Sequence, residues 1–171
     1  MYYILKYQNY EPQIDNSVFI AGGTYVIGRV TIEKDSSVWY NCVLRGDVGS
    51  IKIGSGTNIQ DGTIIHVDRN PGGDTVIGNM VTVGHSCVLH ACKIHDKALI
   101  GMSSTIMDNA IIETESMVAA GSLVTNNKIV RSGEIWAGRP AKFFKKVPQI
   151  DHITKSSENY IMLMKEYPLS R

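Results

Sequence analysis

The fold is decided by one stretch of the sequence, Ile94–Val124, which reads IHDKALIGMSSTIMDNAIIETESMVAAGSLV. An aliphatic residue recurs at every sixth position, and a small residue stands four positions after each of the first five. Six is a multiple of the strand period of two but does not match the helical period of 3.6, so the pattern predicts short strands. The two rows are Ile94, Ile100, Ile106, Ile112, Val118 and Val124, and Ala98, Ser104, Ala110, Ser116 and Ser122.

The same spacing occurs in three earlier runs of the chain. Each hexad is expected to form one short strand and a corner, and three hexads make a coil of about 18 residues in an all-β solenoid. An antiparallel sandwich of short strands is the alternative, but sandwiches do not hold a fixed phase of six over so many residues. The runs are Val26, Ile32, Val38 and Leu44; Ile53, Ile59 and Ile65; and Ile77, Val83 and Leu89.

Two insertions interrupt the repeat. Between Leu44 and Ile53 the phase slips by three residues, and between Ile65 and Ile77 the longer stretch Val67–Thr75 replaces a hexad. The second insertion contains Asn-Pro-Gly-Gly at residues 70–73, which is typical of a loop. Loops that leave a rigid scaffold often carry function.

The two ends of the chain are predicted to differ from the repeats. Residues 1–17 are expected to cap the first coil, and the repeats are expected to end near Val130, followed by a proline-containing turn at 136–142. The apolar spacing in Pro148–Tyr167 suits an amphipathic helix lying along the solenoid. We therefore expect two parts, a β-helix over residues 1–147 and a C-terminal helical segment over 148–171.

Composition excludes several classes of protein. The net charge of the 171 residues is +1, which argues against a nucleic-acid or acidic-membrane partner, and no apolar run is long enough to span a bilayer. The N-terminus lacks the features of a secretory signal. Cys42, Cys87 and Cys92 are odd in number and lie in apolar repeats, so we expect buried reduced thiols in a cytoplasmic protein.

Three residues that directly follow aliphatic positions draw attention to one face of the solenoid. Arg45, His66 and His90 follow Leu44, Ile65 and Leu89, which stand three hexads apart once the insertions are discounted. They should stack on successive coils about 4.8 Å apart and point outward, close enough for the two histidines to share one metal ion.

A third histidine completes the candidate site only if a second chain is present. His85 should lie on the next face or at the corner, out of reach of His66 and His90 of its own chain. Around a threefold axis, the corner of one subunit meets the face of the next, so a homotrimer would bring the three imidazoles together. Three neutral imidazoles with an open fourth position are typical of catalytic zinc; three unrelated surface histidines are the ordinary alternative.

The chain resembles the γ-class carbonic anhydrases and their bacterial relatives in the hexapeptide-transferase superfamily, over about residues 14–147. The resemblance rests on these segments: Leu44-Arg45-Gly46-Asp47, Asn58-Ile59-Gln60-Asp61, Ile65-His66-Val67, Gly84–His90 and Ala137-Gly138-Arg139-Pro140-Ala141. It implies a left-handed parallel β-helix, whereas crossover connections usually run right-handed. It also implies a homotrimer with metal sites at the subunit interfaces and His66, His85 and His90 as ligands.

The resemblance further implies roles for residues around these histidines. Arg45, Asp47 and Asp61 would form ion pairs at the subunit boundary, and Gln60 would orient hydroxide or bicarbonate by hydrogen bonding. Tyr160, on the C-terminal helix, would either hang over the site or pack in the core. The implied reaction is the reversible hydration of carbon dioxide to bicarbonate at zinc, with iron or cobalt as alternative metals.

One departure from the family pattern concerns proton transfer. The fast γ enzymes carry an acidic loop whose glutamates shuttle protons, whereas Val48-Gly49-Ser50 and Arg69-Asn70-Pro71-Gly72 contain no glutamate. Asp68 and Asp74 are the candidate substitutes, and slow hydration is expected. Two other functions fit the fold: an acyltransferase, acetyltransferase or thioesterase acting on CoA esters, and a non-catalytic trimeric scaffold.

Overall fold

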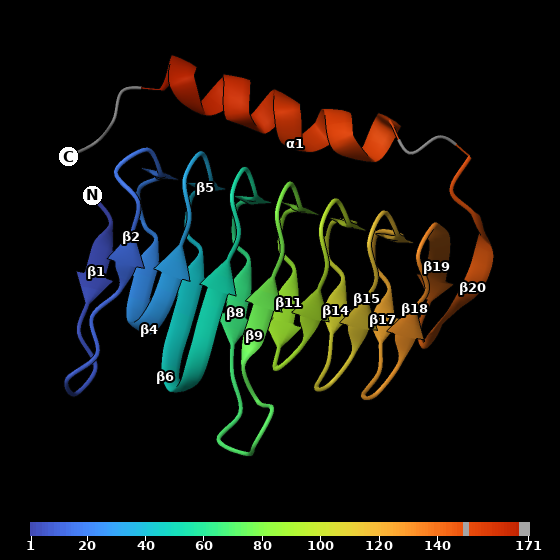
Figure 1. The fold of residues 1–171 in the computed structure, drawn as a ribbon, viewed down its shortest axis with the longest axis horizontal. Helices are drawn as coiled ribbons and strands as arrows, with labels where there is room; N and C mark the ends of the chain where they lie inside the picture. The colour runs from blue at the N-terminus through green and yellow to red at the C-terminus, as the bar shows by residue number, and fades with distance from the viewer. Residues whose placement is uncertain (149–150, 168–171) are drawn as a thin grey trace.

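The computed structural model describes residues 1–148 and 151–167 of the chain. Within them the backbone winds as a parallel β-solenoid, whose coils stack side by side along the long axis in Figure 1. Each coil contributes one strand to each of three faces. Strands β4 (Tyr25–Ile32) and β6 (Val43–Ile53) bend from the first face onto the second, so these two faces are connected as one sheet.

We call the first face the histidine face and the third face the helix face. The histidine face comprises β1 (Tyr3–Leu5), the beginnings of β4 and β6, β8 (Ile64–His66), β11 (Val88–His90), β14 (Thr105–Ile106) and β17 (Leu123–Val124). The second face comprises β2 (Gln13–Ile14), the ends of β4 and β6, β9 (Thr75–Ile77), β12 (Lys93–Ile94), β15 (Ile111–Ile112) and β18 (Ile129–Val130). The helix face comprises β3 (Phe19–Ile20), β5 (Ser37–Val38), β7 (Asn58–Ile59), β10 (Thr82–Val83), β13 (Leu99–Ile100), β16 (Met117–Val118), β19 (Glu134–Gly138) and β20 (Ala141–Lys146).

The core confirms the two rows of the repeat. Every aliphatic residue of the row from Ile94 to Val124 is at most 1% exposed, and so is every small residue from Ala98 to Ser122. Register explains the first row, because Leu44, Ile65, Leu89, Ile106 and Val124 are successive partners on one face. The solenoid interior is therefore a stack of aliphatic side chains.

The corners carry a backbone signature with the same period. From Lys97 onward a residue with positive φ recurs at every sixth position, with φ between 56° and 71°. This left-handed conformation is costly for most side chains and favours glycine and asparagine. The residues are Lys97, Ser103, Asn109, Glu115, Gly121, Asn127 and Gly133.

The predicted end of the repeats near Val130 is wrong by one strand. Trp136 stands six residues after Val130, and it pairs with Val118 in parallel register on β19. An indole in place of an aliphatic side chain hides this last hexad in the sequence. The turn lies at Arg139-Pro140, after which β20 returns antiparallel to β19.

The two insertions lie side by side at the corner between the histidine face and the second face. The pairing of β4 with β6 changes register between Gly28 and Val30 of β4, and residues 47–50 of β6 bulge from the sheet opposite them. The loop between β8 and β9 contacts this bulge, because the Asp74 carboxylate accepts hydrogen bonds from the Ser50 N–H (2.6 Å) and hydroxyl (2.9 Å). Both insertions therefore border the end of β8, where His66 is located.

The C-terminal segment forms the predicted helix over a shorter range. Helix α1 (Asp151–Leu163) and the 3₁₀ turn η1 (Met164–Glu166) run back along the helix face, as Figure 1 shows. Met164 packs with Phe19 and Trp39 of the first coils. Residues 149–150 and 168–171 of the predicted segment lie outside the described residues. Among those described, no helix is long and apolar enough to cross a bilayer.

The three cysteines are buried and free, as expected from their positions in the repeats. Burial raises the pKa of the Cys42 and Cys92 thiols to about 12 and that of Cys87 to about 11. These thiols are therefore protonated at neutral pH and serve as core side chains.

Candidate metal centre

His66 and His90 lie side by side at the ends of β8 and β11. They are register partners in the parallel ladder, and their ring centroids are 5.2 Å apart. Nδ1 of His66 faces Nε2 of His90 at 3.2 Å. The stacking inferred from the hexads is thus present, and it brings two imidazole nitrogens to one point on the surface.

Two aspartates hold the far nitrogens of these imidazoles. The Asp47 carboxylate lies 3.0 Å from Nε2 of His66, and the Asp108 carboxylate lies 2.5 Å from Nδ1 of His90. A carboxylate accepts, so each far nitrogen carries the proton, and each near nitrogen of a neutral ring keeps a lone pair. Two lone pairs cannot hydrogen bond to each other, and a shared cation is the partner that suits both.

The spacing of the two near nitrogens fits zinc. Zn–N bonds of about 2.0–2.1 Å at a tetrahedral angle place two ligand nitrogens about 3.3 Å apart. The observed separation between His66 and His90 is 3.2 Å. The donor set and its carboxylate partners are also those usual for metal-binding histidines.

Asp47 is tied into a dense set of hydrogen bonds. Partial burial raises the pKa of its carboxyl, but hydrogen bonds from the Val48 N–H, His66 and Arg45 outweigh this effect and lower the pKa to about 2. Arg45 forms an ion pair with Asp47 within the chain, and Arg29 donates to the Asp47 carbonyl oxygen at 3.0 Å. Asp47 is therefore a fixed carboxylate at neutral pH.

His85 lies apart from this pair, in the turn between β10 and β11. Its Nδ1 is 2.8 Å from the carboxylate of Asp61, which occupies the equivalent turn of the preceding coil, and the His85 side chain is 43% exposed. In the described part of this single chain, no three histidine, cysteine, aspartate or glutamate residues are grouped to hold a metal ion. Nδ1 of His85 is thus held by Asp61, and Nε2 is left as the ring nitrogen that could bind a metal.

Gln60 directly follows β7 on the helix face, and Tyr160 belongs to α1, which covers that face. The buried Gln60 donates from Nε2 to Oδ1 of Asn58 at 3.1 Å. Tyr160 packs edge-on against Trp39 with ring centroids 5.3 Å apart, and burial, together with the nearby Asp61 charge, raises its pKa. The chain therefore holds two groups: a face group of Arg45, Asp47, His66, His90 and Asp108, and a corner group of Gln60, Asp61 and His85.

Asp108 is the member of the face group that sequence reasoning missed. It stands 18 residues after His90, which is one uninterrupted coil. The length of a coil was the available signal, since residues one coil apart become neighbours.

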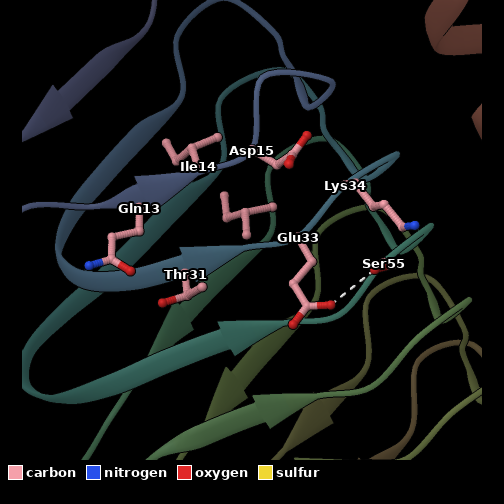
Figure 2. A pocket seen from close by; sticks show the side chains of 8 residues that line it. Gln13, Ile14, Asp15, Thr31, Glu33, Lys34 and Ser55 are labelled. Carbon is pink, nitrogen blue, oxygen red and sulfur yellow. Dashed lines mark hydrogen bonds between the residues drawn. The ribbon is translucent and has the colours of Figure 1, made fainter.

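The groove in Figure 2 is separate from these histidines. It measures about 440 Å³ and is lined by residues of the first coils on the second face, including Gln13, Asp15, Glu33 and Lys34. Glu33 accepts a hydrogen bond from Ser55 across it. No histidine or cysteine lines the groove, so it is not a candidate for the metal centre.

Comparison with known proteins places the chain among carbonic anhydrase-like proteins. Gamma carbonic anhydrase 2, mitochondrial, of Arabidopsis thaliana is 51% identical over 89% of this chain, and the chain spans 57% of that protein's length. A carbonic anhydrase of Geobacillus kaustophilus is 40% identical over 86% of this chain and 80% of its own length. No family model matches the chain.

A solved structure agrees with these relatives. A hexapeptide transferase family protein from Anaplasma phagocytophilum is 51% identical, with a TM-score of 0.93 over 96% of this chain and 98% of that one. The fold is accordingly a left-handed parallel β-helix, the hand that the resemblance implied. The repeat, the stacked histidines and these relatives together show that the chain belongs to the γ carbonic anhydrase-like family of hexapeptide-repeat proteins.

Proposed function

We propose that the chain is one subunit of a homotrimeric carbonic anhydrase of the γ class, in which zinc is held by His66 and His90 of one chain and His85 of the partner subunit. Iron or cobalt would suit the same three imidazoles. The observation that carries the proposal is the pair of facing nitrogens on His66 and His90, 3.2 Å apart and each backed by an aspartate.

An apolar stripe beside the histidines supports the trimer. Tyr25, Ile64 and Val88 point outward from the histidine face and are 38%, 47% and 39% exposed. They lie in one ladder, in which Val43 stands between Tyr25 and Ile64. An apolar surface that borders charged and metal-binding groups marks a contact with another protein, and a second copy places its corner group at the open side of His66 and His90.

The chain's own residues prepare the site. Zinc, when bound by three imidazoles, lowers the pKa of a water molecule to about 7 and so supplies hydroxide for attack on carbon dioxide at neutral pH. Asp47 and Asp108 fix the ring tautomers and orientations of His66 and His90. Gln60 donates from Nε2 to Asn58, so its carbonyl oxygen remains as an acceptor that can orient a hydroxyl group.

Replacing Asp108 with asparagine should weaken metal binding about 10- to 100-fold, because a neutral amide oxygen accepts the hydrogen bond from Nδ1 of His90 more weakly than a carboxylate does. Competition with a chromophoric chelator measures the affinity. Asp35→Asn makes the same change at a half-buried corner between β4 and β5, away from the histidines, and serves as the control. Equal affinities for the two variants would show that Asp108 does not support the site.

Proton removal is the step for which the chain is poorly equipped. Neither insertion contains a glutamate. Asp74 is committed to Ser50, and Asp68 accepts hydrogen bonds from the Asn70 side chain and the Arg69 N–H, which lower its pKa. A proton must then leave through water or buffer.

Carbon dioxide hydration should therefore be slow at low buffer concentration and rise several-fold as an imidazole buffer of pKa about 7 is added. Stopped-flow measurement on protein of known metal content tests this prediction and the proposed function together. Hydration that is fast and indifferent to buffer would reveal an internal shuttle. Metal-loaded protein that stays inactive at every buffer concentration would contradict the assignment, and turnover of acetyl-CoA would then favour an acyltransferase.

A further inference from the structure

The helix α1 is joined to Gln60 by a continuous row of side-chain hydrogen bonds. Gln60 donates to Asn58 at 3.1 Å, Asn58 donates to the Thr82 hydroxyl at 2.9 Å, and Thr82 donates to the Ser156 hydroxyl at 3.1 Å. The first three residues come from the helix face of the solenoid, on or beside β7 and β10, and Ser156 comes from α1. The row thus links β10 to α1 through Thr82 and Ser156, which are 74 residues apart in the sequence.

These polar groups are enclosed, so their partners matter. Asn58 is 1% exposed, Thr82 is 4% exposed and Gln60 is 6% exposed. A buried amide or hydroxyl that loses its partner is destabilised and turns to find another. The orientation of the Gln60 amide therefore depends on the side chains that hold it.

A backbone carbonyl sets the direction of the whole row. The Val81 carbonyl oxygen can only accept, and it lies 3.4 Å from Nδ2 of Asn58. Asn58 must therefore direct Oδ1 toward Gln60, and Gln60 must donate to it from Nε2. The Thr82 oxygen already accepts from Asn58, so its proton goes to Ser156. The free end of the row is the carbonyl oxygen of Gln60.

We infer that Ser156 and Thr82 are positioning residues for the corner group: the Val81 carbonyl sets which end of the Gln60 amide accepts, and α1 holds the rotamer of Gln60 through Thr82 and Asn58. This inference rests on the proposed function for its consequence in catalysis, because Gln60 is there the residue that orients a hydroxyl group. It does not rest on that function for the coupling itself. The helix is then part of the site through Ser156, whereas its Tyr160 packs against Trp39.

The coupling can be measured without metal and without activity. In the metal-free protein, the side-chain N–H₂ protons of Asn58 and Gln60 are observed by ¹⁵N-resolved NMR, and their exchange with solvent reports how firmly each amide is held. Ser156→Ala and Thr82→Val should each speed exchange of the Gln60 amide by about five- to tenfold, the effect expected for losing one hydrogen bond. Backbone amides of β7 and β10 should keep their exchange rates.

Two further variants separate positioning from packing. Ser157→Ala removes the neighbouring hydroxyl of α1, which is fully buried but bonds only to the Thr154 carbonyl oxygen among described contacts, and it should leave Gln60 exchange unchanged. Ser156→Thr keeps a hydroxyl and should restore slow exchange. If Ser156→Ala and Ser157→Ala give the same Gln60 exchange rate, the inference is wrong, whether or not the protein hydrates carbon dioxide.

The catalytic consequence forms the second arm of the test. In metal-loaded protein, Ser156→Ala should lower kcat with unchanged metal content, and Ser156→Thr should recover it. If Ser156→Ala speeds exchange of the Gln60 amide but leaves kcat unchanged, the coupling has no role in catalysis. Wild-type protein without hydration activity would instead count against the proposed function, since the exchange experiment remains informative.

Discussion

Replacing His90 with alanine is expected to reduce the bound divalent metal from about one ion per chain to almost none. The substitution removes one of three imidazoles and leaves Asp108 without the ring that it orients. His66→Ala should have the same effect, because the two near nitrogens act on one ion. Elemental analysis of protein purified without chelator measures the result.

His95→Ala is the matched control for this experiment. His95 follows Ile94 as His90 follows Leu89, but on the second face, and it is exposed. Its removal should leave the metal content at the wild-type value. A His90→Ala protein that binds as much metal as His95→Ala would place the metal elsewhere.

Placing a charge in the apolar stripe is expected to dissociate the trimer. Ile64→Asp puts a carboxylate at the most exposed position of the stripe, directly between the Val43 and Val88 partners. Burying an unpaired charge at an interface is costly, so the particle should change from three chains of 18.8 kDa to one. Metal should be lost as well, because His85 of the partner subunit is no longer supplied.

Val76→Asp serves as the control for Ile64→Asp. Val76 is also an exposed β-branched residue, on β9 of the second face, where the proposal places no subunit contact. Light scattering should find the trimer intact in this variant. If Val76→Asp dissociates the trimer and Ile64→Asp does not, the subunit interface is not on the histidine face.

Much of the fold could be predicted because each six-residue repeat corresponds to one strand and one corner of a coil. The row from Ile94 to Val124 predicts which side chains are buried in the interior. Counting hexads without the two insertions predicts that His66 lies beside His90, which the register confirms. The last hexad is not predicted because it carries Trp136 where the repeat has an aliphatic residue, although the spacing from Val130 is regular. The hand of the helix came from the family resemblance, since no residue spacing encodes it.

The candidate site could be predicted only in part, for a similar reason. Ligands that follow stacked aliphatics are visible in sequence, but supporting residues are visible only when coil length is used, as Asp108 shows. The contact between Thr82 and Ser156 depends on where α1 docks, and helix periodicity says which face is apolar without saying which strands it covers.

The sharing of one metal site between two chains is tested most directly by mixing two inactive variants. His85→Ala keeps the face group and His90→Ala keeps the corner group, so each alone should bind almost no metal. When the two variants are coexpressed in equal amounts, about three quarters of the trimers contain both chains. Each mixed trimer has one complete interface out of three, so about a quarter of the wild-type metal content should return. A mixture that binds no more metal than the separate variants, while assembling as mixed trimers, would contradict the shared site.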